Sequence, residues 1–365
     1  MRPEHFQILR TSHGPYGSVY FDDSHNTEDA AAQLELKWRA LREQLVQQGA
    51  EPALTECIEQ AVTGSRPPIG RSGRGVIASA GGVLLNEHLI RPAGPVVRVS
   101  PLPYLVPVVE HGVDHSAYAV AIVDHEGADI TLWRDGTAVS DTVDGDAYPV
   151  HKASGAESAG YGDPQRTAEG ARAQNIRAVA DRLAKLVDDT APEFVFIAGE
   201  VQSRSDLVAD LPERVTSRAV ELHVGARHSG FDDDALQHEI EQVFQRRRVT
   251  VIDDAAQRFS AEVGRGSGLA TEGLDGVTAA LRAGAVDTLI IGELGDATVV
   301  ADDDITVIAP NANVLSELGT APTQTLRADE ALPMVAIATD ASLVRTDERI
   351  SPGDGIAAIL RYPLP

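Results

Sequence analysis

The residues whose types first suggest chemistry form a glycine-rich segment, Gly264-Arg265-Gly266-Ser267-Gly268. Consecutive flexible N–H groups of this kind can bind a phosphate. However, the segment lacks the Gly-Lys-Ser/Thr ending of a P-loop, follows an expected helix rather than a strand, and has no Rossmann spacing. The pattern therefore favours a structural turn between two helices.

The sequence predicts no metal site, no cofactor and no catalytic residue. Its 11 histidines include no His-Glu-x-x-His pair or other closely spaced ligand set. The acidic stretch 141–146 has neither the register nor the distal Glu of an EF-hand. Neither Ser72 nor Ser267 lies in a Gly-x-Ser-x-Gly motif. The single cysteine, Cys57, falls within an amphipathic helix, where we expect a packed thiol.

Two charged runs have structural interpretations that we prefer. Residues 246–248 are three consecutive arginines, which either bind a phosphate or, as we expect, end an acidic helix where the macrodipole favours cations. Residues 302–304 are three aspartates, interpreted as a solvent-facing hairpin tip.

A long loop rich in Gly and Ser, residues 151–166, gives a different signal. It leads into a helix with Arg166, Arg172 and Arg177, and residues 151–187 hold 6 basic and 4 acidic side chains. A flexible loop on a locally basic helix fits a phosphate-rich cleft. An ordinary surface loop is the alternative.

The elements that must position these residues fall into three predicted units. Residues 1–112 form an α+β N-terminal unit: a strand at 18–21, two helices with apolar residues at helical spacing, and strands at 76–79, 83–85 and 96–99. Residues 113–228 carry strands at 118–123, 130–133 and 139–143, a long helix, a strand at 194–199, a helix at 206–211 and a closing strand at 220–224. That order predicts a ribonuclease-H-like α/β layer. In the long helix the apolar face is predicted to contain Ala171, Ile176, Val179, Leu183 and Leu186.

The third unit, residues 229–365, alternates helices and strands and predicts an α/β/α sandwich. Its expected strands are 286–291, 306–309, 334–338 and 357–360. The fold class is thus α/β in three domains.

The net charge limits the partners. The chain has 55 acidic and 31 basic side chains, a formal charge of −24. Non-specific binding to nucleic acid depends on Lys and Arg, so bare DNA and anionic membranes are excluded as partners. The acidity is uneven: the first unit holds 10 basic and 12 acidic side chains, the second 11 and 20, and the third 10 and 23. The nearly neutral first unit and the locally basic residues 151–187 are therefore the parts of the chain that could contact RNA.

The compartment follows from what the sequence lacks. One cysteine permits no intramolecular disulfide framework, the first twenty residues carry no apolar signal region, and no stretch is long and apolar enough to span a membrane. We expect a cytoplasmic protein.

The chain resembles archaeo-eukaryotic peptide-chain release factors and their Pelota relatives. The resemblance rests on a β-meander at 114–139, Tyr-Pro-Val-His-Lys at 148–152, the glycine loop, the Arg-rich helix at 165–187, and Phe-Val-Phe-Ile-Ala-Gly at 194–199. Residues 257–293 similarly resemble the start of the family's ribosomal L7Ae-like third domain. More narrowly, the whole chain is similar to the bacterial branch of the family, in particular to the actinobacterial relatives of the ribosome hibernation factor Balon.

The resemblance implies a ribosome-binding hibernation factor that regulates translation in stress and dormancy. It implies occupancy of the A site of the 70S ribosome, contacts with 16S and 23S rRNA and the ribosomal proteins there, and cooperation with elongation factor Tu. The implied decoding-centre turn is Gln47, Gln48 and Gly49, and the implied rRNA-binding residues are His151, Lys152, Arg166, Arg172 and Arg177. The implied peptidyl-transferase-centre loop is Gly160, Tyr161, Gly162, Asp163, Pro164 and Gln165.

Two departures from the family pattern argue against termination activity. Release factors carry Gly-Gly-Gln in this loop, whereas here Pro164 separates Gln165 from the glycines, fixes φ and removes an N–H. The turn at 47–52 also lacks the Asn-Ile-Lys-Ser tetrad that reads stop codons. We therefore expect a non-enzyme. A peptidyl-tRNA hydrolase using Gln165, and a Pelota-like rescue factor working with a translational GTPase, are the alternatives.

Overall fold

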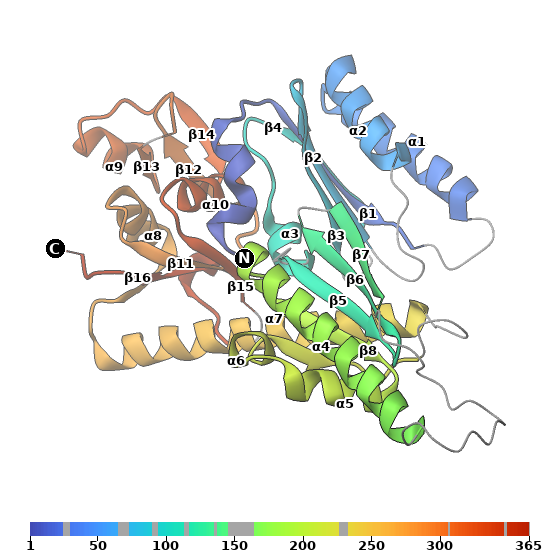
Figure 1. Cartoon of the computed structure of the whole chain (residues 1–365). Helices are drawn as coiled ribbons and strands as arrows, with labels where there is room; N and C mark the ends of the chain where they lie inside the picture. Colours follow the sequence, from blue (N-terminus) through green and yellow to red (C-terminus); the bar gives the residue numbers. More distant parts are fainter. Residues whose placement is uncertain are drawn as a thin grey trace. The chain divides into compact units, whose positions relative to one another are not determined.

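The structure, a computed structural model, describes residues 1–24, 30–64, 73–89, 94–112, 117–134, 137–144, 164–225, 233–305, 307–346 and 349–364. Its residues divide into unit 1, Met1–Asp114 with Gln245–Pro365, and unit 2, His115–Phe244 (Figure 1). Both units combine helices with sheets, so the predicted α/β class is confirmed. The three domain boundaries stay a prediction.

The N-terminal part of unit 1 is an antiparallel sheet with the strand order β3-β2-β1-β4. The strands are β1 (Tyr16–Asp22), β2 (Gly73–Ser79), β3 (Gly82–Leu89) and β4 (Val96–Ser100), and the helices are η1 (Pro3–Thr11), α1 (Ala30–Gln47), α2 (Pro52–Gly64) and α3 (Val106–His111). The predicted apolar stripes of α1 and α2 are buried against one face of the sheet, where Trp38 and Ile58 meet Val19. Figure 1 shows both helices (blue) beside the strands.

The C-terminal part of unit 1 is the predicted α/β/α sandwich. Its main sheet has the order β10-β16-β11-β15, formed by β10 (Ala270–Glu272), β11 (Val286–Ile291), β15 (Ser342–Arg345) and β16 (Ile356–Leu360), with only the β11–β15 pair parallel. Alternate strand residues face opposite sides, as pleating requires. Leu289 packs with α8 (Gly273–Arg282) and α10 (Ala328–Ala338), whereas Ile290 packs with Phe259 of α7 (Asp233–Arg265).

A small antiparallel sheet, β13-β12-β14, completes unit 1. It comprises β12 (Thr298–Ala301), β13 (Ile308–Ala309) and β14 (Gln324–Arg327), with α9 (Ala312–Glu317) nearby and η2 (Gly353–Gly355) before β16. One continuous core joins the two parts of unit 1, because Phe6, Leu9 and Tyr20 belong to the same buried cluster as Leu289 and Leu332.

Unit 2 is built on one five-stranded sheet with the order β7-β6-β5-β8-β9. The strands are β5 (Tyr118–Val123), β6 (Gly127–Arg134), β7 (Thr137–Asp144), β8 (Phe194–Gly199) and β9 (Ala219–Glu221), and the helices are α4 (Pro164–Thr190), α5 (Val201–Asp210) and α6 (Glu213–Thr216). β5, β6 and β7 form an antiparallel meander, while β5, β8 and β9 are parallel. This is the ribonuclease-H-like order expected from the sequence.

Three local predictions are wrong. Residues 334–338 lie in α10 and not in a strand. The prediction failed because a short apolar run that is buried on every side has no periodicity that would distinguish a helix from a strand. Arginines 246–248 lie in the middle of α7 and not at its end, so the macrodipole argument does not apply to them. The glycine-rich segment 264–268 leads from α7 into β10 rather than directly into another helix, and Gly266 and Gly268 adopt positive φ there.

Candidate functional site

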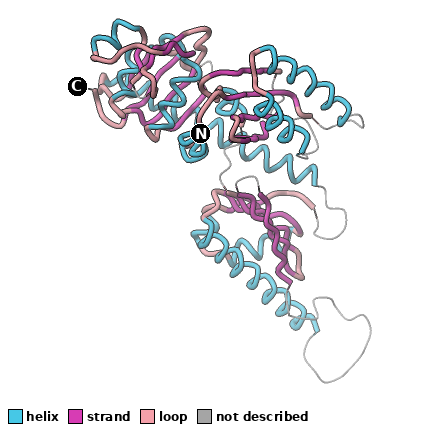
Figure 2. The backbone as a smooth tube through the Cα atoms, turned by 90° about the horizontal axis from the view of Figure 1, so that it is seen from above, coloured by secondary structure: helices cyan, strands magenta, loops and turns pink. Residues whose placement is uncertain are grey.

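Helix α4 carries the described members of the predicted rRNA-binding set, Arg166, Arg172 and Arg177. Its predicted apolar residues, Ala171, Ile176, Val179, Leu183 and Leu186, are all buried. Four of them, all except Ala171, join the core under the sheet, and Figure 2 shows the helix running beside the strands of unit 2. Burial of this stripe fixes the helix rotation, which leaves the other face to solvent.

The outward face of α4 carries charges of both signs, with the acids Glu169 and Asp181 exposed among the cations. Arg172, Arg177 and Lys185 are exposed. Arg182 is instead bound through Nε to Oδ2 of Asp141 on β7, at 2.6 Å. Among the described residues no acidic group pairs with Arg177 or Lys185, so these two charges are available to an anionic partner. We call them the α4 cation pair.

Most of the expected peptidyl-transferase-centre loop lies outside the described residues, as do His151 and Lys152. Its last two positions are described in the main chain: Pro164 and Gln165 are the first two residues of α4. Proline at this place suits a helix start, because the first-turn N–H groups have no helical acceptor. Gln165 therefore has a helical main chain, and Arg166 follows it in the same turn.

The expected decoding-centre turn lies at the end of α1. Gln47 is the last residue of the helix, and Gln48 and Gly49 form the exposed turn that follows. The Gln48 side chain is bound to the edge strand β4: its Nε2 donates to the Val97 carbonyl at 2.8 Å, and its Oε1 accepts from the Val99 N–H at 3.0 Å. Gly49 has φ +84°, which favours glycine. Gln48 thus has a structural role, and an RNA contact by this turn stays a prediction.

A polar cluster that the sequence analysis missed lies where the parallel strands of unit 2 end. His125 follows β5, Glu200 and Arg204 follow β8, and His223 follows β9. The Glu200 carboxylate lies 3.1 Å from His125 Nδ1 and accepts from Ser203 Oγ at 3.3 Å. The sequence did carry a signal for this site, because a buried strand ending in Gly199 and followed by a helix marks the ligand edge of a parallel sheet.

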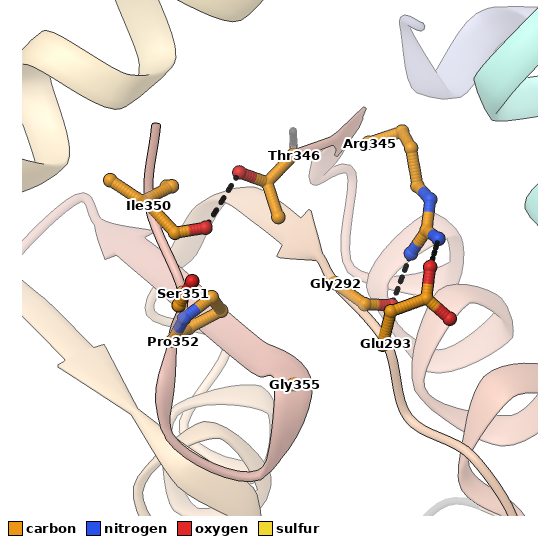
Figure 3. A pocket seen from close by; sticks show the side chains of 8 residues that line it. All are labelled: Gly292, Glu293, Arg345, Thr346, Ile350, Ser351, Pro352 and Gly355. Carbon is orange, nitrogen blue, oxygen red and sulfur yellow. Dashed lines mark hydrogen bonds and ion pairs between the residues drawn. The ribbon is translucent and has the colours of Figure 1, made fainter. Parts of the chain in front are cut away.

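A crevice in unit 1 lies at the carboxyl ends of the parallel strands β11 and β15 and is drawn in Figure 3. Its charged side chains are already paired. The Arg345 guanidinium donates to the carbonyls of Ile291 and Gly292 and to the carboxylates of Glu110 and Glu293. All of these acceptors come from unit 1, so among the described residues that line the crevice the two charged ones, Glu293 and Arg345, are paired with each other.

A buried ionic network joins β4 to α10 inside unit 1. Arg98 donates to both carboxylate oxygens of Asp329 at 3.0 and 2.9 Å and to Glu330 Oε1 at 3.0 Å, while its guanidinium lies 3.5 Å from the centre of the Tyr104 ring. Burial alone would raise the pKa of Asp329, but hydrogen bonds from Arg98 and Arg327 outweigh it and hold that pKa below its ordinary value. For Glu330 burial prevails and its pKa is raised.

Two absences concern only the described part of the chain. No group of three or more His, Cys, Asp or Glu side chains there is arranged to hold a metal ion. Among the same residues, no helix has the length and hydrophobicity needed to cross a membrane.

Comparison with known families and proteins gives one family match and two matching relatives. The profile described as "Bacterial archaeo-eukaryotic release factor family 2" matches residues 117–265. The uncharacterized protein Rv2629 of Mycobacterium tuberculosis strain H37Rv is 49% identical over 363 residues, which cover 99% of this chain and 97% of the relative. The uncharacterized protein MT2704 of strain CDC 1551 matches with the same figures.

Similar chains are found among solved structures of archaeal proteins. A model of ribosome-bound archaeal Pelota and ABCE1 matches at 14% identity, covering 100% of this chain and 95% of that chain, with a TM-score of 0.43. The archaeal translation termination factor aRF1 matches at 15% identity over 99% of both chains, with a TM-score of 0.27.

Proposed function

We propose that this chain, which belongs to the bacterial archaeo-eukaryotic release factor family, is a ribosome-binding factor that occupies the A site and holds ribosomes in an inactive state. The first residue-level support is the α4 cation pair, Arg177 and Lys185, on the helix that directly follows the 151–163 loop. RNA backbones are bound through such cations, whereas the formal charge of −24 discourages binding to RNA elsewhere.

In this proposal the parts of the chain have separate tasks. The loop ahead of α4 reaches toward the peptidyl-transferase centre, and the turn after α1 lies at the decoding centre. The acidic C-terminal part of unit 1 makes protein contacts, with elongation factor Tu as the proposed partner. A role in hibernation, stress and dormancy, cytoplasmic location and kinship with Balon belong to the same proposal.

In this proposal the chain has no enzymatic activity. Peptidyl-tRNA hydrolysis by release factors requires a glutamine on a glycine-flanked main chain, and here Gln165 is the second residue of a helix with Pro164 before it. If Gln165 were catalytic, Gln165→Ala would lower ester hydrolysis on stalled ribosomes by orders of magnitude. We expect no hydrolysis above background for either chain, and a measurable rate that the substitution abolishes would establish the hydrolase instead.

Rescue of stalled ribosomes is the remaining alternative, and the family resemblance to Pelota favours it. Rescue needs turnover: stalled ribosomes would be split or recycled in a reconstituted assay with a translational GTPase. Our proposal predicts stable occupancy without splitting.

The binding proposal is tested by sedimentation through sucrose. We expect the wild-type chain to co-sediment with 70S ribosomes and the double variant Arg177→Glu/Lys185→Glu to remain largely in the free fraction. The matched control is Arg214→Glu/Arg218→Glu, which reverses two exposed or half-exposed charges elsewhere on unit 2. Equal co-sedimentation of all three chains would remove the α4 cation pair from the interface.

A further inference from the structure

A small pocket in unit 2 lies outside the carboxyl ends of β8 and β9. It has a volume of about 260 Å³, and the described residues of its wall are Gly199, Glu200, Val201, Arg204, His223, Val224 and Gly225. In sheets with parallel strands, ligands bind at this edge because the strand–helix loops diverge there. Gly199 makes the wall possible: its φ is +113°, and a Cβ at this position would lie 2.0 Å from the Val123 carbonyl oxygen.

The pocket contains a buried positive charge for which the described residues of unit 2 supply no anion. Arg204 is only 5% exposed, and among the described residues its one hydrogen-bond acceptor outside its own helix is the Leu222 carbonyl. Its Nε has no partner there. Arginine is almost never buried unless it is paired. Arg345, by comparison, has its hydrogen-bonding capacity largely filled, because its guanidinium is bound by two carboxylates and two carbonyls.

The start of α5 forms part of the pocket wall through Val201. Glu200, the N-cap residue, makes no side-chain capping hydrogen bond, and the N–H groups of Val201, Gln202 and Ser203 have no acceptor among the described residues. Such N–H groups and the helix dipole together favour an anion.

The neighbouring carboxylates are already engaged. Glu200 is bound to His125 and Ser203, and the second nearby carboxylate, Glu239, accepts from the His223 N–H at 2.8 Å. Neither forms an ion pair with Arg204. An entering anion would therefore find the guanidinium and the α5 N–H groups unoccupied.

We propose that this pocket binds a phosphate group, held by Arg204 and the first-turn N–H groups of α5. The volume suits one phosphate with part of a ribose, whether it belongs to an RNA backbone or to a free nucleotide. The inference does not depend on the proposed ribosome function, because it rests on the geometry of unit 2 alone.

The test is calorimetric titration of the full chain with inorganic phosphate at constant ionic strength. We expect saturable binding that Val201→Asp weakens roughly tenfold, since a carboxylate at the pocket mouth repels the anion. Val201→Asn adds a polar side chain without the charge and should bind like wild type. Val201 is exposed and an acidic residue in a first helical turn is favourable, so this variant should remain folded.

Arg204→Met should abolish binding, and Arg214→Met, which removes an exposed arginine bound to Asp188, should not. If Arg204→Met fails to fold, the two Val201 variants decide the matter. Competition then identifies the source: displacement by oligouridylate at lower concentration than by AMP assigns an RNA backbone, and the reverse order assigns a nucleotide. Absence of binding up to about 10 mM phosphate, or equal binding by wild type and Val201→Asp, would overturn the proposal. Because no ribosome is present, a negative result leaves the proposed function untouched.

Discussion

Replacing Arg98 by methionine tests how unit 1 is held together. The substitution keeps an unbranched apolar side chain but removes the cation that serves both Asp329 and Glu330. Asp329 keeps Arg327, whose Nε and Nη2 lie 3.0 and 3.1 Å from its two carboxylate oxygens. Glu330, with a side chain only 3% exposed, loses its ionic partner. Removing one partner of a buried pair costs about 3–5 kcal/mol, and the retained Arg327 and the 22% exposure of Arg98 place the expected loss near the lower end, about 3 kcal/mol.

The assay is urea unfolding at pH 7, with Arg214→Met as control. That exposed arginine is paired with Asp188 at 2.7 Å, and a surface pair of this kind contributes at most about 1 kcal/mol. The double variant Arg98→Met/Glu330→Gln should recover part of the loss, because it no longer leaves an ionised carboxylate buried without a cationic partner. A loss below about 1 kcal/mol for Arg98→Met, or no recovery in the double variant, would refute the reasoning.

Three further outcomes are expected in the same unfolding assay. Gly199→Ala should destabilise by about 3 kcal/mol or more, since a Cβ would lie 2.0 Å from the Val123 carbonyl oxygen at φ +113°; a loss below about 1 kcal/mol would contradict this. Gln48→Ala should cost about 1–2 kcal/mol through its two lost hydrogen bonds to β4, and no measurable change would show that the turn does not depend on them. Glu330→Gln should gain stability relative to wild type as the pH rises from about 4 to 7. Burial raises the pKa of Glu330, so the folded wild type binds more protons than the unfolded chain in that window and loses stability with rising pH; a pH-independent difference would contradict the assignment.

The sequence predicts a helix or strand correctly where one face of that element is buried and the other is exposed. The helical spacing in α1 and α4 correctly predicted both the helix and its buried side, because periodicity reports burial on one face. It failed for α10, whose residues from Ala328 to Ile337 are nearly all buried, since an apolar run packed on every side has no such period. The short strands β10, β12 and β14 have three or four residues each, too few to show a pattern.

The candidate sites divide in a similar way. The exposed cations of α4 were predictable, because the apolar residues recur at helical spacing and the basic residues fall between them, on the other face. The pocket around Arg204 was predictable only in part. Gly199 before a helix marked this edge of the sheet, but the pocket combines residues that follow both β8 and β9 and depends on one buried arginine that finds no carboxylate among the described residues. For Gln48 the sequence missed a structural role. The family resemblance suggests an RNA contact for this residue, but in the structure the nitrogen and the oxygen of its side-chain amide both bind the edge strand β4.

The central claim, A-site occupancy without catalysis, is tested most directly by an electron-microscopy map of the full chain bound to 70S ribosomes with elongation factor Tu present. Our account predicts density for the chain in the A site, with α4 and the loop before it directed at the peptidyl-transferase centre and Arg177 and Lys185 against rRNA. Density at another site on the ribosome, or α4 facing solvent within the A site, would contradict it.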